Sequence, residues 1–288
     1  MWFGVVSLFP ELVVGVAEHG VVGRAFRDGT LALEQIQLRD HAIDRHGTVD
    51  DKPYGGGAGM VLRVDVVAQA VADAQARWRR YAAAGSADRV RVIALAPHGE
   101  RLGQQRVNEL AREPGLILLC GRYEGFDERV HDAVADCTLS IGDYVISGGE
   151  LAAQVLIDAV ARQRPGVLGN SESADAESHL AGLLDYPHYT RPENSDWGAV
   201  PSTLVSGNHE AIRRWRRQQS LLRTYLERPD LFGTAAIDVA DRELLAQALA
   251  ERKASGEDAD DDKGGPGTGP RTENDNHHEG EEAGDAEQ

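Results

Sequence analysis

The stretch Leu116–Glu150 constrains the fold more than any other part of the chain. Two short apolar runs, Leu116–Cys120 and Cys137–Ile141, each pass directly into a glycine-rich turn. These turns are Gly121–Gly125 and Ser140–Gly149. In open α/β sheets, ligands bind where buried strands end in turns of this kind. The stretch therefore predicts an α/β protein whose binding site lies at these two strand ends.

Other segments extend the same architecture. The residue patterns predict strands over 2–8, 31–38 and 90–96, and helices over 65–81 and 150–162. The strand Val90–Ala96 ends in Pro97-His98-Gly99, which we expect to form a third turn beside the first two. The helix Glu150–Arg162 carries an apolar stripe of Leu151, Val155, Ile157 and Val160.

The loop Thr48–Met60 contains four glycines in five positions. Such a backbone can approach a ligand closely. No Gly-Lys-Ser/Thr follows it, and it lacks the GxGxxG register of dinucleotide-binding loops. The spacing alone fits a plain flexible loop and a lid equally well.

Charge is distributed unevenly along the chain. The net charge is −17, of which −9 comes from Lys253–Gln288 and −8 from the remainder. The tail has almost no apolar residues to offset the entropy of folding, so we expect it to be disordered. Asn208–Arg228 is instead a basic helix with a net charge of +4. Charge alone fits RNA binding and a solvated surface helix equally well.

Several classes of protein are disfavoured. The sequence contains no run of about 18 apolar residues that could span a membrane. The pattern of its N-terminus predicts a first strand and not a signal peptide. The two cysteines, Cys120 and Cys137, lack metal-ligand spacing. They are typical of reduced thiols in a cytoplasmic protein. No metal site is predicted.

Six ordered motifs resemble one family over residues 1 to about 232. The motifs are SLFPE (Ser7–Glu11), TVDDKPYGGGAGM (Thr48–Met60), LLCGRYEGFDERV (Leu118–Val130), SIGDYVISGGELAA (Ser140–Ala153), LLDYPHYTRPE (Leu183–Glu193) and VSGNHEAIRRWRRQQSLLRT (Val205–Thr224). With these motifs the chain is similar to the TrmD family of bacterial tRNA (guanine-N1)-methyltransferases, which act at position 37 beside the anticodon.

The resemblance implies an α/β fold of the SPOUT class, with a trefoil-knotted sheet domain and a smaller C-terminal helical domain. It implies S-adenosylmethionine as methyl donor, a homodimer with active sites at the subunit interface, and the tRNA anticodon stem-loop as partner. The expected organisation is a cofactor-binding domain at 1–168, a flexible linker at 169–185, a tRNA-binding domain at 186–252 and the acidic tail at 253–288.

The resemblance also assigns residues to the donor and to the RNA. The cofactor-contact positions match Pro97, Gly121, Glu124, Ile141, Gly142, Asp143, Tyr144, Val145, Ile146, Gly148 and Gly149. On the basic helix, Arg213, Arg216, Arg217 and Arg223 are the expected RNA contacts.

Methyl transfer to guanine N1 requires removal of the N1 proton and stabilisation of the charge that develops on O6. The family uses a linker aspartate as the base and an arginine at the end of the preceding helix. Arg162 matches that arginine, whereas the aspartate position is occupied by Glu177. We expect Glu177 to be the base, with Asp175 as the alternative if the linker register differs.

Two other functions are considered: a SPOUT enzyme that methylates another base or a ribose 2′-OH, and a non-catalytic RNA-binding module. Transfer of a methyl group to guanine N1 of an unmodified tRNA transcript would distinguish a tRNA (guanine-N1)-methyltransferase from both of these alternatives. The family is often assisted by Mg²⁺, but the sequence reveals no site for that ion.

Overall fold

The computed structural model describes residues 1–82, 89–168 and 182–256. They form two compact units. The first comprises Met1–Asp185 with Asp230–Ala235, and the second comprises Tyr186–Pro229 and the chain from Ala236 onward. Most of the predicted linker and of the acidic tail lies outside the described residues, so the domain boundaries drawn from the sequence stay a prediction.

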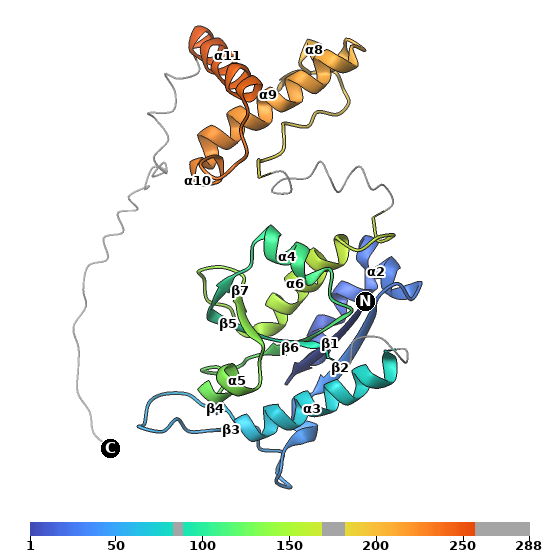
Figure 1. Ribbon diagram of the computed structural model, residues 1–288, viewed down its shortest axis with the longest axis vertical. Coiled ribbons are helices and arrows are strands. Elements are labelled where there is room, and N and C mark those ends of the chain that lie inside the picture. Colours follow the sequence, from blue (N-terminus) through green and yellow to red (C-terminus); the bar gives the residue numbers. More distant parts are fainter. Residues whose placement is uncertain (83–88, 169–181, 257–288) are drawn as a thin grey trace, which may run out of the picture. The chain divides into compact units, whose positions relative to one another are not determined.

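The first unit is built on a five-stranded sheet in the order β2-β1-β6-β5-β7 (Figure 1). All four strand pairings are parallel. The strand β6, the first apolar run of the opening stretch, lies in the middle and is buried along its whole length. The strands are β1 (Trp2–Ser7), β2 (Ala32–Gln37), β5 (Arg91–Arg101), β6 (Gly115–Cys120) and β7 (Cys137–Ser140).

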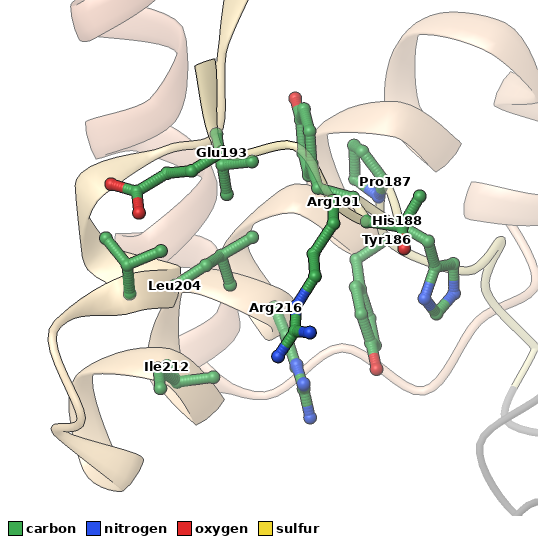
Figure 2. Close-up of a pocket in the computed structure, with 12 residues that line it drawn as sticks. Tyr186, Pro187, His188, Arg191, Glu193, Leu204, Ile212 and Arg216 are labelled. Atoms are coloured by element: carbon green, nitrogen blue, oxygen red, sulfur yellow. The ribbon is translucent and has the colours of Figure 1, made fainter.

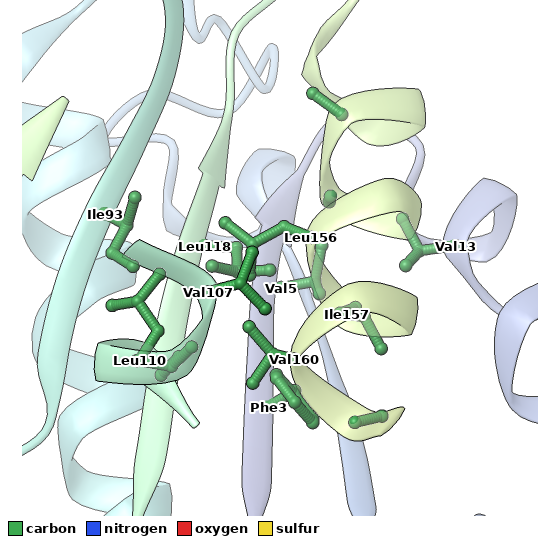
Figure 3. Close-up of a cluster of buried hydrophobic side chains, with 14 of the residues drawn as sticks. Phe3, Val5, Val13, Ile93, Val107, Leu110, Leu118, Leu156, Ile157 and Val160 are labelled. Carbon is green, nitrogen blue, oxygen red and sulfur yellow. The ribbon is translucent and has the colours of Figure 1, made fainter. Parts of the chain in front are cut away.

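Helices cover both faces of this sheet, as a parallel sheet requires. Alternate residues of β6 enter two separate apolar clusters: Leu116 and Leu118 face one, and Ile117 and Leu119 face the other. Figure 3 shows the first cluster, between the sheet and α6. That side carries η1 (Pro10–Val13), α1 (Gly15–Glu18), α2 (Gly20–Arg27), α4 (Gln104–Leu110) and α6 (Gly149–Arg162), and the other carries α3 (Val64–Tyr81) and α5 (Glu128–Ala133).

The apolar stripe predicted for α6 is only half right. Ile157 and Val160 are buried, but Leu151 and Val155 are each about half exposed. The residues that face the sheet are instead Ala153, Leu156, Ile157 and Val160 with Ala152. These positions follow the helical repeat, and the small alanines allow the helix to pack closely against the strands.

The turn predicted at Pro97-His98-Gly99 is wrong. The strand β5 remains extended to Arg101, and its pairing with β7 is interrupted: Leu95 and Glu100 both lie opposite Leu139. The intervening residues therefore bulge out of the ladder. Pro97 suits this segment because it has no N–H to donate to a neighbouring strand. A Cβ on Gly99 would lie 2.6 Å from the backbone nitrogen of Leu139, so the chain crosses β7 at a point where only glycine fits.

Short elements complete the first unit. Two-residue strands β3 and β4 pair in an antiparallel manner at the two ends of the glycine-rich loop. Their bounds, with that of a short helical turn, are η2 (Leu38–His41), β3 (Asp50–Asp51) and β4 (Val61–Leu62).

The second unit is mainly helical. Its two long helices, α9 and α11, pack against each other through Leu221, Leu245 and Ala248, which are buried. The side chain of Asn208 accepts hydrogen bonds from the N–H groups of Glu210 and Ala211, which caps α9. Its elements are β8 (Asn194–Ser195), β9 (Gly198–Ala199), α8 (Ser202–Val205), α9 (His209–Glu227) and α11 (Val239–Ser255). The short helix α10 (Pro229–Phe232) belongs mostly to the segment Asp230–Ala235, which is part of the first unit.

The helix α11 extends past the residue at which the predicted tail begins. The sequence places the start of the tail at Lys253, whereas α11 continues to Ser255. Gly256 then ends the helix in the left-handed conformation, with φ of 79°, a C-terminal cap that favours glycine. Residues 257–288 lie outside the described part of the chain. Among the described residues, no helix is long and apolar enough to cross a membrane.

Candidate functional site

A pocket of about 680 Å³ lies in the first unit, at the ends of β6 and β7 and at the bulge within β5. Most of its lining comes from three segments that are far apart in the sequence: residues 95–98, residues 121–126 and residues 139–149. All eleven residues assigned to the cofactor line this one pocket: Pro97, Gly121, Glu124, Ile141, Gly142, Asp143, Tyr144, Val145, Ile146, Gly148 and Gly149. The expected binding site at the strand ends is thus a real concavity.

The loop after β7 is shaped by its own backbone contacts. The Ser140 hydroxyl donates to the carbonyl of Gly142 at 3.2 Å and lies 3.3 Å from its N–H. Gly142 has φ of 150°, and a Cβ there would lie 2.5 Å from the ring of Tyr144. A side chain at this position would therefore displace the ring or the loop.

Two further glycines bring the loop against the turn that follows β6. The N–H of Gly149 donates to the carbonyl of Gly121 at 2.9 Å. A Cβ on Gly149 would lie 2.7 Å from the Cα of Cys120, and one on Gly148 would collide with Arg122 and Glu150. The pocket wall is consequently main chain packed on main chain, with little room for any added atom.

A buried ion pair lies behind this wall. Glu150, at the start of α6, is 1% exposed, and its Oε2 lies 3.0 Å from Nη2 of Arg122. Its Oε1 accepts from Nε of Arg122 at 3.1 Å and from the hydroxyl of Ser7. Arg122 also donates to the carbonyl of Ser147 at 3.2 Å and stacks 4.9 Å from the ring of Phe9. These contacts join the ends of β1 and β6 to the loop and to α6.

The Cys120 thiol next to this pair is fully buried. Burial, with a smaller contribution from the Glu150 carboxylate, raises the pKa of Cys120 well above its usual value. The thiol therefore stays protonated at neutral pH and is no nucleophile.

The glycine-rich loop ends at the rim of the pocket. The N–H of Glu124 donates to the carbonyl of Met60 at 3.0 Å, and the N–H of Leu62 donates to the carbonyl of Gly125 at 2.9 Å. Gly59, with φ of 81°, lies directly against the Glu124 side chain. The loop is thus anchored beside the pocket at this end, and its action as a lid stays a prediction.

The ionisable side chains of the pocket are mostly acidic. Glu124, Glu128 and Asp143 line it, and Arg122, the one arginine that lines it among the described residues, is paired with Glu150. The rings of His98 and His131 meet edge to face at 4.5 Å. Burial, and secondarily the neighbouring His98, lower the pKa of His131, which favours its neutral state at pH 7. Its Nδ1 lies 2.9 Å from the Thr138 hydroxyl. This charge balance suits a ligand that carries positive charge.

Comparison with known proteins identifies the family. A family model described as tRNA (Guanine-1)-methyltransferase TrmD matches residues 1–234. The chain belongs to this family. Three of its relatives are named tRNA (guanine-N(1)-)-methyltransferase: one from Proteus mirabilis, one from Shewanella loihica and one from Chromohalobacter salexigens. They are 53%, 53% and 51% identical over 87%, 88% and 88% of this chain and 97%, 99% and 95% of their own lengths.

Membership of the TrmD family confirms the resemblance and the enzyme class. The parallel sheet covered by helices agrees with the predicted α/β fold of a SPOUT protein. A methyltransferase family of this kind uses S-adenosylmethionine as its general methyl donor and tRNA as its substrate.

The predicted catalytic residues are not among the described residues that line this pocket. Glu177 and its alternative Asp175 lie outside the described residues. Arg162 is the last residue of α6 and does not line the pocket, whereas Gly149 at the other end of the same helix does. At 1.5 Å per residue, Arg162 lies ~20 Å along the helix from the pocket wall of its own chain.

The four arginines predicted to bind RNA have different surroundings on α9. Arg213 is exposed, and Nε of Arg223 lies 3.1 Å from Glu227. Arg216 stacks 4.9 Å from the ring of Tyr186. Arg217 donates from Nε and Nη2 to both oxygens of Asp241, at 2.8 and 2.6 Å.

The pair between Arg217 and Asp241 joins α9 to α11. The hydrogen bonds from Arg217 lower the pKa of Asp241, and those to Asp241 raise the pKa of Arg217. The main role of Arg217 in this structure is therefore to hold the two helices together. Sequence reasoning missed this role, and it also missed Arg191, which lies near Arg216.

Proposed function

We propose that this chain transfers a methyl group from S-adenosylmethionine to N1 of the guanine at position 37 of tRNA. The observation that carries the proposal is the convergence in one pocket of the eleven residues that the family resemblance assigns to the donor. Family membership supports guanine N1 over a ribose hydroxyl or a non-catalytic role. A tRNA substrate also supports a cytoplasmic location.

The pocket suits S-adenosylmethionine in size and charge. Its volume falls within the range of about 300–1,000 Å³ that is usual for cofactor sites. When bound, the donor supplies a methyl group on a positively charged sulfonium, next to an ammonium group. Glu124 and Asp143 would face these charges. Backbone N–H and C=O groups of Gly121 and of residues 141–146 would bind the adenosine, and the glycines admit it closely.

The acceptor chemistry needs a base for the N1 proton and a cationic group for the charge on O6. Glu177, or Asp175 in its place, would accept the N1 proton, and Arg162 would stabilise the charge on O6. The target guanine has to leave the anticodon stack to reach the donor.

The position of Arg162 favours a homodimer. If it acts on the guanine, it has to come from a second copy, because it lies at the far end of α6 from its own donor pocket. The outer face of α6 carries Leu151 and Val155, both about half exposed, beside Leu12, whose carbonyl accepts from Gln154 at 2.5 Å. A second copy that packs on this apolar face would bury it and complete the site.

Complementation tests the shared site. Arg162→Ala and Gly149→Val should each be inactive alone, because each lacks one half of every site. Mixed dimers of the two should recover up to half of the wild-type activity at one intact site. Full activity of a monomeric preparation would contradict the proposal.

The reaction itself is tested with an unmodified tRNA transcript that carries guanine at positions 36 and 37. We expect 1-methylguanosine at position 37, detected by mass spectrometry and as a primer-extension stop. Glu177→Gln should abolish the stop while donor binding persists. Unaltered turnover would assign the base to Asp175, and methylation of ribose would contradict the proposed reaction. Chelation with EDTA in the same assay tests whether Mg²⁺ assists.

A further inference from the structure

A second pocket, of about 400 Å³, lies wholly within the second unit. It is formed by the extended segment Tyr186–Glu193, by α8 and by the first half of α9. Figure 2 shows that the guanidinium groups of Arg191 and Arg216 lie between the apolar side chains of Leu204 and Ile212 on one side and Tyr186 on the other.

The positive charge of this pocket is not neutralised. Among the residues that the structure describes, no carboxylate lies within 4.0 Å of either guanidinium group. Glu193 also lines the pocket, but its carboxylate points away from both arginines (Figure 2). By contrast, Arg217 and Arg223 on the same helix are paired with acidic residues. Two unpaired guanidinium groups in a concavity form a site for an anion.

The opposite wall of the pocket is apolar. Leu204 and Ile212 are each partly buried and lie across from the arginines. Arg216 is positioned by its stacking on Tyr186, at 4.9 Å from the ring centre. A small inorganic anion would make no use of the apolar wall. A nucleotide would use both sides, because its phosphate binds guanidinium groups while its base packs flat against apolar side chains or an arginine plane.

We propose that this pocket binds one unstacked nucleotide of the tRNA substrate, with the phosphate between Arg191 and Arg216 and the base against Leu204 and Ile212. The inference rests on the proposed function only in taking tRNA as the ligand. It adds to the basic helix a site for a single nucleotide, and it brings in Arg191 from outside that helix.

The phosphate contact is tested by the salt dependence of binding. The full-length protein without donor is titrated with an unmodified tRNA transcript at several KCl concentrations. Arg191→Ala and Arg216→Ala should each weaken binding about tenfold, since each loses a charged contact. The matched control Arg242→Ala, an exposed arginine on α11 outside the pocket, should stay within about twofold.

The double variant decides whether the two arginines share one phosphate. Loss of one neutralised phosphate makes the slope of log K against log salt shallower by about 1. The slope measured for the double variant should therefore be shallower than that of the wild type by about 1 in total. The effects of the two single substitutions on the slope should not be additive. A loss of about 2 would mean separate phosphates, and an unchanged slope would overturn the anion site altogether.

The base contact has a separate readout. Leu204→Ala should weaken binding about fivefold with an unchanged salt slope, because it removes apolar contact and no charge. In a series of tRNAs with single abasic substitutions, one position should abolish the difference between Leu204→Ala and wild type. If no position does so, the pocket holds no base.

Two further outcomes are distinguishable. A wild-type protein that binds tRNA but transfers no methyl group would refute the proposed reaction and leave the pocket intact. The second outcome concerns an acidic peptide as the ligand. If polyglutamate displaces tRNA from the wild-type protein, and if the Arg191→Ala variant no longer binds polyglutamate, the pocket binds an acidic peptide and not a nucleotide.

Discussion

The donor pocket of the first unit is built largely from main chain, whereas the pocket of the second unit is built from long side chains. In the first, Gly142, Gly148 and Gly149 leave no space for an added atom. In the second, Arg191 and Arg216 project from exposed positions. A backbone wall places many weak contacts rigidly around one ligand, whereas charged side chains adapt to a flexible polyanion. Substitutions in the backbone wall of the first pocket should therefore act on stability and donor binding together, whereas substitutions of the two arginines of the second pocket should act on RNA affinity alone.

Removal of the buried carboxylate of the first unit should have the largest effect. Glu150→Ala leaves Arg122 without its partner behind the pocket wall, and we expect a loss of about 3–5 kcal/mol in the free energy of unfolding. Chemical denaturation measures this loss, and donor affinity should fall with it. Asp40→Ala removes an exposed carboxylate elsewhere in the first unit and should change stability by less than about 0.5 kcal/mol. Equal losses of stability in the two variants would contradict a special role for the buried carboxylate.

A single added methyl group should have the next largest effect. In Gly149→Ala the new Cβ meets the Cα of Cys120 at 2.7 Å, so the loop has to move. We expect a loss of about 1–3 kcal/mol in stability and a donor affinity at least about tenfold weaker, measured by calorimetry. Gly103→Ala is the control, since a Cβ there meets nothing within 4 Å. Unchanged donor affinity in Gly149→Ala would contradict a backbone-built wall.

Within the second unit, two arginines of α9 should separate stability from RNA binding. Arg217→Ala strands the carboxylate of Asp241, which is 8% exposed, and should cost about 1–2 kcal/mol, because the partly exposed arginine is screened by solvent. Arg213→Ala, at an exposed position, should leave the unfolding transition unchanged and weaken tRNA binding. If Arg217→Ala instead weakened tRNA binding and left stability unchanged, Arg217 would be a contact for RNA.

Acidification should affect the two units in different pH ranges, although weakly. The folded-state pKa of His131 is lowered below 6.5, so the unfolded chain binds a proton first and stability falls as pH drops below about 6.5. The pKa of Asp241 is lowered below 3.8, so its contribution is present above that value and is lost only at more acidic pH. Thermal unfolding between pH 7.5 and 5.5 should therefore shift less in His131→Asn than in wild type. An identical shift would remove His131 as the cause.

Much of the first unit follows from sequence because its signals are local. The run Leu116–Cys120 is continuously apolar, and the central strand β6 is buried on both faces. The bulge at Pro97–Gly99 was missed because it depends on the distant crossing of β7 over Gly99. The eleven residues of the donor pocket came from family resemblance, since spacing alone cannot bring three separate segments together.

The second unit was harder to predict because charge does not reveal pairing. Arg216 and Arg217 are adjacent in sequence, but only Arg217 faces Asp241, a residue 24 positions away. Arg191 lies in a segment without periodicity, and only the fold brings it to Arg216. A run of arginines thus predicts a basic surface but does not predict which members are available to RNA.

The central claim is that the first unit binds the donor and the second unit binds tRNA. Hydrogen exchange with each ligand added separately tests this claim most directly. S-adenosylmethionine alone should protect the amides of residues 121–125 and 141–149 and leave residues 186–216 unchanged, whereas tRNA alone should protect residues 186–216. Donor-induced protection confined to the second unit, or none at 141–149, would contradict the account.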